Sequence, residues 1–253
     1  MGSESTKLHT RILRYELGAD DARVYWKRHH AGLSANEAFE HYWFGAKSMP
    51  RVENILSNME ARFGAYPNAL AVLEQWTTMS PRTRAMICHW HTQLADPFYR
   101  SFTADFLVER RELGYLAVTR EQVSEWVSGV FPQWAAATTR TATSKLLTTA
   151  FKAGLIESGR SPRTLTYPLV EDLALEYILY LLRETTFEGS ILRNPYLVSV
   201  GLVESDLTYR LRKLHGIDFK QQGSIVEFGW RYDDLTEWGR ATIHQDESPA
   251  EAS

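Results

Sequence analysis

The stretch from Val118 to Pro168 constrains the fold more than any other part of the chain. It begins with VTREQVSEWVSGVF, whose apolar residues recur at helical spacing, and continues through the short connection PQWAAA. A second helical pattern, TTRTATSKLLTTAFK, follows, and GLIESGRSPRTLTYP then places turn residues between short β-prone runs. Helix, short connection, helix and basic β-ribbon, in this order, predict a winged helix-turn-helix.

The second helix of this stretch should begin near Thr138 or Thr139, where hydroxyl groups can accept the free N–H groups of its first turn. Gly154 suits the left-handed residue that ends a helix, and the sequence GRSP supplies the turn of the ribbon. One face of the helix is apolar and is predicted to be buried. That face consists of Leu146, Leu147, Ala150, Phe151 and Leu155.

The opposite face carries short hydroxyl side chains and cations, and no carboxylate occurs between Thr138 and Gly154. From Thr139 to Arg163 the sequence contains five cations and one acid, Glu157, so its local charge is +4. The net charge of the whole chain is −3. Such an asymmetry is typical of an element that faces phosphates. The predicted DNA-contact residues are Arg140, Thr143, Ser144, Lys145, Thr148, Lys152, Arg160 and Arg163. A winged helix used only for packing or protein contacts stays open as an alternative.

The rest of the chain predicts a mainly α protein. Residues 1–114 contain several amphipathic segments rich in large aromatic residues, which favours a helical bundle as an amino-terminal domain. Residues 115–185 hold the winged helix-turn-helix and the following helix. In 186–244, a helix followed by GIDFKQQGSIVEFGW predicts a second winged-helix-like unit with a short β-hairpin. The polar ends, Met1 to Thr6 and 245–253, are expected to fray, and the latter is predicted to be a disordered tail.

Length, composition and cysteine content limit the surroundings of the protein. No apolar run approaches the roughly 20 residues that span a bilayer, and no signal-peptide segment precedes the helices. The single cysteine, Cys88, excludes an internal disulfide and fits a reducing compartment. A cytoplasmic protein without a membrane partner is therefore expected. At a pI near 6.3, DNA contacts must come from local patches.

Metal, cofactor and catalytic patterns are weak. Cys88-His89-Trp90-His91 places three possible ligands close together, yet on a helix the two histidines point about 200° apart. A core cysteine flanked by partly exposed histidines is the better interpretation. The sequence holds no phosphate-binding loop, nucleophile elbow or HExxH motif. We expect no cofactor, no metal and no enzyme activity, although an acidic nuclease site assembled from distant residues stays open.

The order of these features resembles a known family. A helical amino-terminal half precedes the helix TTRTATSKLLTTAFKAGLI, a basic ribbon that ends in YPLV, and the helix LALEYILYLLRE. Together they resemble the BrxA family of BREX phage-defence systems. The resemblance also includes SMPRVENILSNMEARFG and DPFYRSFTADFLVERRELG, and it extends from Arg51 to Trp230. It rests on feature order and on a pattern of apolar and small residues, without a catalytic motif.

The resemblance implies a small, non-enzymatic double-stranded DNA-binding protein that acts beside the methyltransferase and ATPase components of such a system. It implies DNA contacts at Arg140, Thr143, Ser144, Lys145 and the ribbon arginines Arg160 and Arg163. Few of these residue types read bases, so phosphate contacts with low sequence specificity are expected. Two other functions stay open: an adaptor that docks a larger defence enzyme, and a winged-helix transcription regulator.

Overall fold

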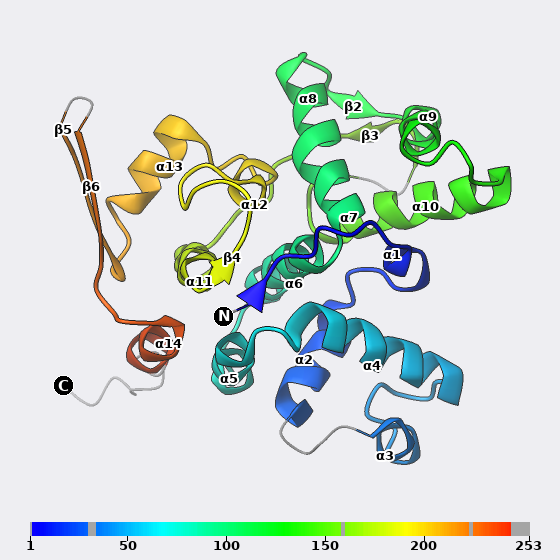
Figure 1. The fold of residues 1–253 in the computed structure, drawn as a ribbon, viewed down its shortest axis with the longest axis horizontal. Helices are drawn as coiled ribbons and strands as arrows, with labels where there is room; N and C mark the ends of the chain where they lie inside the picture. The colour runs from blue at the N-terminus through cyan, green and yellow to red at the C-terminus, as the bar shows by residue number, and fades with distance from the viewer. Residues whose placement is uncertain (1, 30–33, 158–159, 223–224, 244–253) are drawn as a thin grey trace, which may run out of the picture.

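The structure is a computed structural model that describes residues 2–29, 34–157, 160–222 and 225–243. It is mainly helical, as predicted (Figure 1). The helices are α1 (Arg11–Arg14), α2 (Ala19–Arg28), α3 (Ala35–Glu40), α4 (Met49–Phe63), α5 (Pro67–Gln75), α6 (Pro81–Ala95), α7 (Pro97–Ser101), α8 (Leu107–Glu112), α9 (Arg120–Val130), α10 (Ala136–Lys152), α11 (Asp172–Arg183), α12 (Pro195–Val198), α13 (Glu204–Leu211) and α14 (Leu235–Ile243), with a π-helical turn, η2 (Phe102–Phe106), between α7 and α8.

The strands of the described residues pair in short two-stranded ladders. These are β1 (Gly2–Ser3) with β4 (Thr185–Thr186), β2 (Ala117–Val118) with β3 (Arg163–Thr164), and β5 (Ile217–Gln222) with β6 (Ile225–Trp230). The β5–β6 hairpin confirms the hairpin predicted around Gln-Gln-Gly, with Ile217 opposite Trp230 at its base. Whether α13 and this hairpin form a second winged unit stays a prediction.

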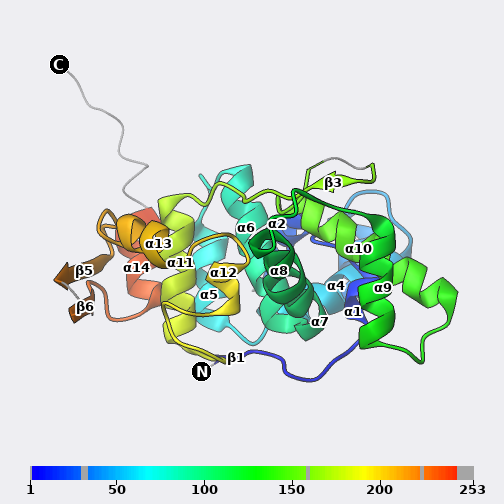
Figure 2. The ribbon, with the colours of Figure 1, turned by 90° about the horizontal axis from the view of Figure 1, so that it is seen from above.

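Helix α6 runs through the middle of the molecule (Figures 1 and 2). It begins at a residue pair typical of helix starts, because Ser80 accepts a hydrogen bond from the backbone N–H of Thr83 and Pro81 occupies the first turn. Side chains from Met86 to Leu94 are buried on all sides of the helix. A helix surrounded by protein in this way connects the parts packed around it, and one hydrophobic cluster extends from Ile12 to Ile243. The predicted domains 1–114, 115–185 and 186–244 therefore share a core.

The histidines of α6 are fully buried, so the prediction that they are partly exposed is wrong. His89 hydrogen-bonds to the hydroxyl groups of Tyr99 and Ser199, at 2.9 and 3.1 Å. His91 bonds to the carbonyl of Arg62 and the hydroxyl of Tyr177, at 3.0 and 2.7 Å. Burial lowers the pKa of His89 to about 3 and that of His91 to about 4. Both rings are therefore neutral core polar groups with each nitrogen satisfied.

The amino terminus is held in place from Gly2 to Ser5, so the prediction that it frays is wrong for these residues. Backbone pairing of β1 with β4 places Glu4 in a buried position. Its carboxylate accepts hydrogen bonds from the backbone N–H of Glu188, at 2.9 Å, and from the hydroxyl of Tyr196, and it lies 3.6 Å from the guanidinium of Arg100. A buried carboxylate needs such partners, and no local sequence pattern indicates them.

The predicted tail, 245–253, lies outside the described residues. Within the described part of the chain, no helix combines the length and the apolar character needed to cross a bilayer.

Candidate nucleic-acid interface

The segment from α8 to β3 follows the order helix α8, strand β2, helices α9 and α10, an isolated β-bridge at Ile156, and strand β3. Val118 of β2 lies opposite Arg163 of β3, and Ile156 forms a bridge with Leu165 on the other side. The backbone N–H of Glu157 donates to the carbonyl of Thr164 at 2.8 Å, which extends this ladder. Three short antiparallel segments thus adjoin the helix pair α9 and α10.

Helix α9 begins where the sequence encodes a capping box. The Thr119 side chain accepts from the N–H of Gln122, whose own side chain accepts from the N–H of Thr119. Helix α10 begins at Ala136, before the predicted Thr138, and its N-cap residue offers no side-chain bond. Stacking of Trp134 on Phe131, with ring centroids 3.9 Å apart, orders the connection instead.

The buried stripe of α10 differs from the prediction at one position. Four of the five predicted apolar residues are buried, whereas Phe151 is 47% exposed. Thr143 takes the core-facing place, and its hydroxyl donates to the carbonyl of Thr139 at 2.9 Å. Because that bond satisfies the hydroxyl donor, burial of Thr143 leaves no unpaired hydrogen. Thr143 therefore cannot contact DNA, and its assignment as a DNA-contact residue is wrong.

The other predicted contact residues reach the surface to different extents. Arg140, Lys152 and Arg160 are exposed, and the remaining four are half-buried: Ser144, Lys145, Thr148 and Arg163. On α10 the outward positions Ala137, Thr141, Ser144 and Thr148 follow one another at helical spacing. They form the outer stripe of α10, which is small and uncharged.

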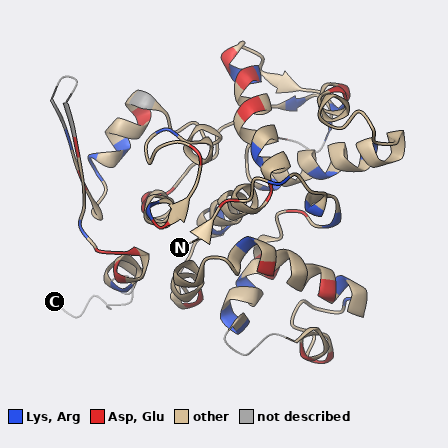
Figure 3. Cartoon of the chain, viewed as in Figure 1, with Lys and Arg blue, Asp and Glu red and all other residues tan. Residues whose placement is uncertain are grey.

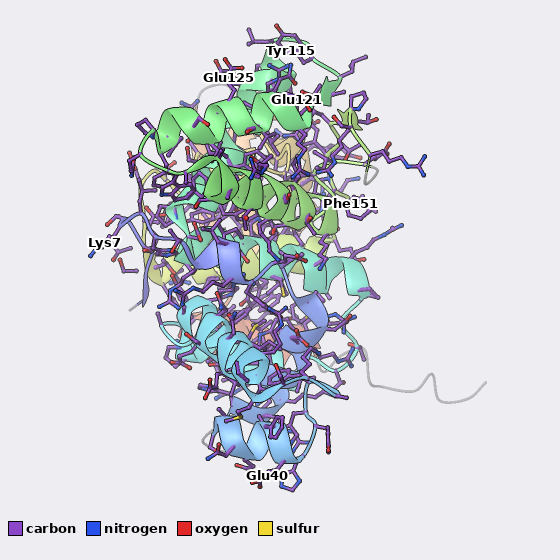
Figure 4. All side chains as sticks on the ribbon, turned by 90° about the vertical axis from the view of Figure 1, so that its right-hand side faces the viewer. Lys7, Glu40, Tyr115, Glu121, Glu125 and Phe151 are labelled. Atoms are coloured by element: carbon purple, nitrogen blue, oxygen red, sulfur yellow. The ribbon has the colours of Figure 1, made fainter. Side chains whose placement is uncertain are left out.

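Neighbouring helices border the outer stripe. α10 packs against α9 along one flank and α1 along the other. Figure 4 views this end of the molecule, with α10 between α9 and α1 and Phe151 at one end of α10. Figure 3 shows that α10 itself carries no acidic residue, whereas α8 carries both signs. The acids Glu121 and Glu125 lie on the exposed surface of α9.

Arg120 belongs to the same surface, although it is not among the DNA-contact residues predicted from the sequence. Its guanidinium donates to the hydroxyl of Ser144 at 2.5 Å, and its backbone N–H donates to the hydroxyl of Ser161 at 3.3 Å. Burial lowers the pKa of Arg163, and the neighbouring charge of Arg120 lowers it further. Arg120 thus connects α9, α10 and the ribbon. A cation directly after a capping threonine, with Arg163 in the paired strand, is the signal that could have indicated it.

The two lysines of α10, Lys145 and Lys152, form ion pairs with Glu16 of the amino-terminal segment. The ammonium of Lys145 lies 2.9 Å from one carboxylate oxygen of Glu16, and that of Lys152 lies 2.6 Å from the other. Burial opposes ionisation of Glu16, but the hydrogen bonds from Lys152 and Lys145 outweigh it and hold its pKa below the ordinary value. Glu16 therefore offsets part of the local positive charge, a long-range effect that the local sequence does not contain.

Comparisons with known proteins inform the fold only. The sequence matches no protein-family model and no curated protein. Among solved structures, the chain is similar to the crystal structure of an uncharacterized protein from Magnetospirillum magneticum, with a TM-score of 0.57 and 11% sequence identity. The match covers 76% of this chain and 97% of that chain. The similarity indicates a shared fold across nearly the whole of that protein.

Proposed function

We propose that the protein binds double-stranded DNA through α10 and the β2–β3 ribbon, as a non-enzymatic accessory protein of a BREX-like phage-defence system. In this proposal α8, β2, α9, α10, Ile156 and β3 form a winged helix-turn-helix with α10 as the recognition helix. The order of these elements and their antiparallel ladder support that assignment. The defence role is inferred from the resemblance to the BrxA family.

The main support for the DNA-binding proposal is that the outer stripe of α10 consists of small, uncharged side chains. A major groove about 12 Å wide admits a helix, and small side chains allow its backbone to come close. Thr141, Ser144 and Thr148 supply hydroxyl groups along this stripe. The exposed residues Arg120 and Arg140 lie beside it, and their guanidinium groups are suited to contacts with DNA phosphates.

Low sequence specificity follows from the same side chains. Bases are read most strongly by asparagine, glutamine and bidentate arginine aimed into the groove. The outer stripe contains alanine, threonine and serine instead. Affinity would then come mainly from phosphate contacts and would fall steeply with salt.

An adaptor function is the second candidate, and exposed apolar side chains favour it. Leu113, Tyr115 and Leu116 are largely exposed on the connection between α8 and β2, and Tyr167 and Leu169 are exposed after the ribbon. Such residues are common where another protein docks. An adaptor without DNA affinity would pass through a DNA column at low salt. A transcription regulator, in contrast, would protect a defined operator in a footprint at its own promoter.

A gel-shift series with random-sequence duplex DNA, single-stranded DNA and duplex RNA tests the proposal. We expect the tightest binding to duplex DNA, because the deep and narrow major groove of A-form RNA does not admit a helix. Binding should weaken as salt is raised. Equal affinity for all three nucleic acids, or a preference for single strands, would contradict the placement of α10 in a major groove.

A further inference from the structure

We propose that Glu16 occupies the position of a DNA phosphate on α10, so that the protein binds duplex DNA fully only when this carboxylate leaves Lys145 and Lys152. The inference rests on the proposed DNA-binding function of the same face. It adds an internal competitor that tunes affinity. Three observations support this proposal: the arrangement of charges around Glu16, the anchoring of its backbone and the exposure of its side chain.

The two lysines make one anion site. They are seven residues apart on α10, which corresponds to about 10 Å along the helix axis. Both side chains nevertheless reach the same carboxylate, one ammonium on each oxygen, at 2.9 and 2.6 Å. A phosphodiester also presents two oxygen acceptors and one negative charge. The site that holds Glu16 is therefore chemically suited to a phosphate of the DNA backbone.

The backbone at Glu16 is fixed by a buried arginine. The Arg62 guanidinium donates to the carbonyl groups of Leu17 and Glu16, each at 2.8 Å, and to that of Tyr15 at 3.4 Å. Its aromatic neighbour Tyr15 lies beneath the same guanidinium, 5.2 Å from ring centroid to Cζ. Glu16 is consequently held close to α10 at a high effective concentration, as a tethered competitor should be.

The Glu16 carboxylate is exposed enough to be replaced by a phosphate on the two lysines. It is 26% exposed, and its lysine partners are 27% and 47% exposed. Ion pairs with this much solvent contact are weak and are screened by salt. A change of side-chain rotamer is enough to release both lysines, so the exchange of carboxylate for phosphate requires no unfolding of the backbone.

The Glu16→Gln variant tests the competition, because it keeps the shape of the side chain and removes its charge. Binding to random duplex at low salt should become roughly 3- to 30-fold tighter, the range expected when two half-exposed ion pairs no longer compete. The slope of log affinity against log salt should steepen by about 1 to 2, as two more cations reach phosphates. Glu40→Gln is the matched control: Glu40 is exposed on α3, far from α10 (Figure 4), and its loss should leave both quantities nearly unchanged.

A double-mutant cycle separates this inference from a general charge effect. With Lys145→Gln and Lys152→Gln already present, adding Glu16→Gln should produce no gain, because the competitor has nothing left to block. An equal gain in that background, or no gain in the wild-type background while wild-type binding is measurable, would overturn the role of Glu16 and leave DNA binding intact. Absence of duplex binding by the wild type and by Glu16→Gln alike would overturn both proposals.

Discussion

Reversing the charges of Arg120 and Arg140 together, as Arg120→Glu and Arg140→Glu, should weaken binding to random duplex DNA by about 100-fold or more at low salt. Both side chains are exposed beside the outer stripe of α10. In the proposed complex, each substitution removes a phosphate contact and adds a repulsive charge in its place. Fluorescence anisotropy with a labelled duplex, measured over a salt series, gives the affinity and its slope, which should become shallower by about 2.

The matched control changes the net charge equally at a distance. Lys27 is exposed at the end of α2, and Arg240 is exposed on α14, on the side of the molecule opposite α10 (Figure 1). At about 0.1 M salt, Lys27→Glu with Arg240→Glu should weaken binding only slightly, because charges beyond a Debye length of about 10 Å are then largely screened. Similar losses for the two double variants would show that overall charge, not the surface around α10, governs DNA affinity.

The largest stability effect is expected at Arg62. Replacing it with methionine should lower the free energy of unfolding by about 3 to 5 kcal/mol. The side chain is buried, and it donates to three carbonyl groups of the segment that precedes α2. Methionine fills similar volume but leaves these acceptors without a donor. Chemical denaturation monitored by circular dichroism measures the change.

Arg51→Met on the same helix provides the control for Arg62. Arg51 is exposed, its Cζ lies 5.2 Å from the ring centroid of Tyr15, and its guanidinium donates to the carbonyl of Arg14 at a long 3.3 Å. Its loss should cost about 0.5 kcal/mol or less, as is usual for a surface residue. Equal costs at the two positions would mean that Arg62 contributes apolar contact only, and that its hydrogen bonds do not hold the Glu16 segment.

Elements with a strong local pattern could be predicted from the sequence. Ser80-Pro81 marks the start of α6, and Thr119 with Gln122 marks the start of α9. The β5–β6 hairpin follows from two β-prone runs around a turn. In each case the residues that determine the structure lie within a few positions of one another, so periodicity and capping chemistry are sufficient.

The face of α10 could be predicted only in part, because its neighbours come from distant segments. α1 and α9 cover its two flanks, which turns Thr143 toward the core and leaves Phe151 exposed. Helical spacing alone would allow Thr143 and Phe151 to lie on either the buried or the exposed face of α10. The partners Glu16 and Lys145 are separated by 129 positions, a pairing that no local pattern contains.

The central claim is that the outer stripe of α10 lies against duplex DNA. A photo-cross-linker attached at Thr141→Cys tests it directly, since Thr141 is exposed on that stripe. The only native cysteine, Cys88, is buried, and burial raises its pKa to about 12, so labelling is confined to the new thiol. We predict strong cross-linking to duplex DNA from Thr141→Cys and little from Glu40→Cys. Equal cross-linking from both positions, or more from Glu40→Cys, would contradict the claim.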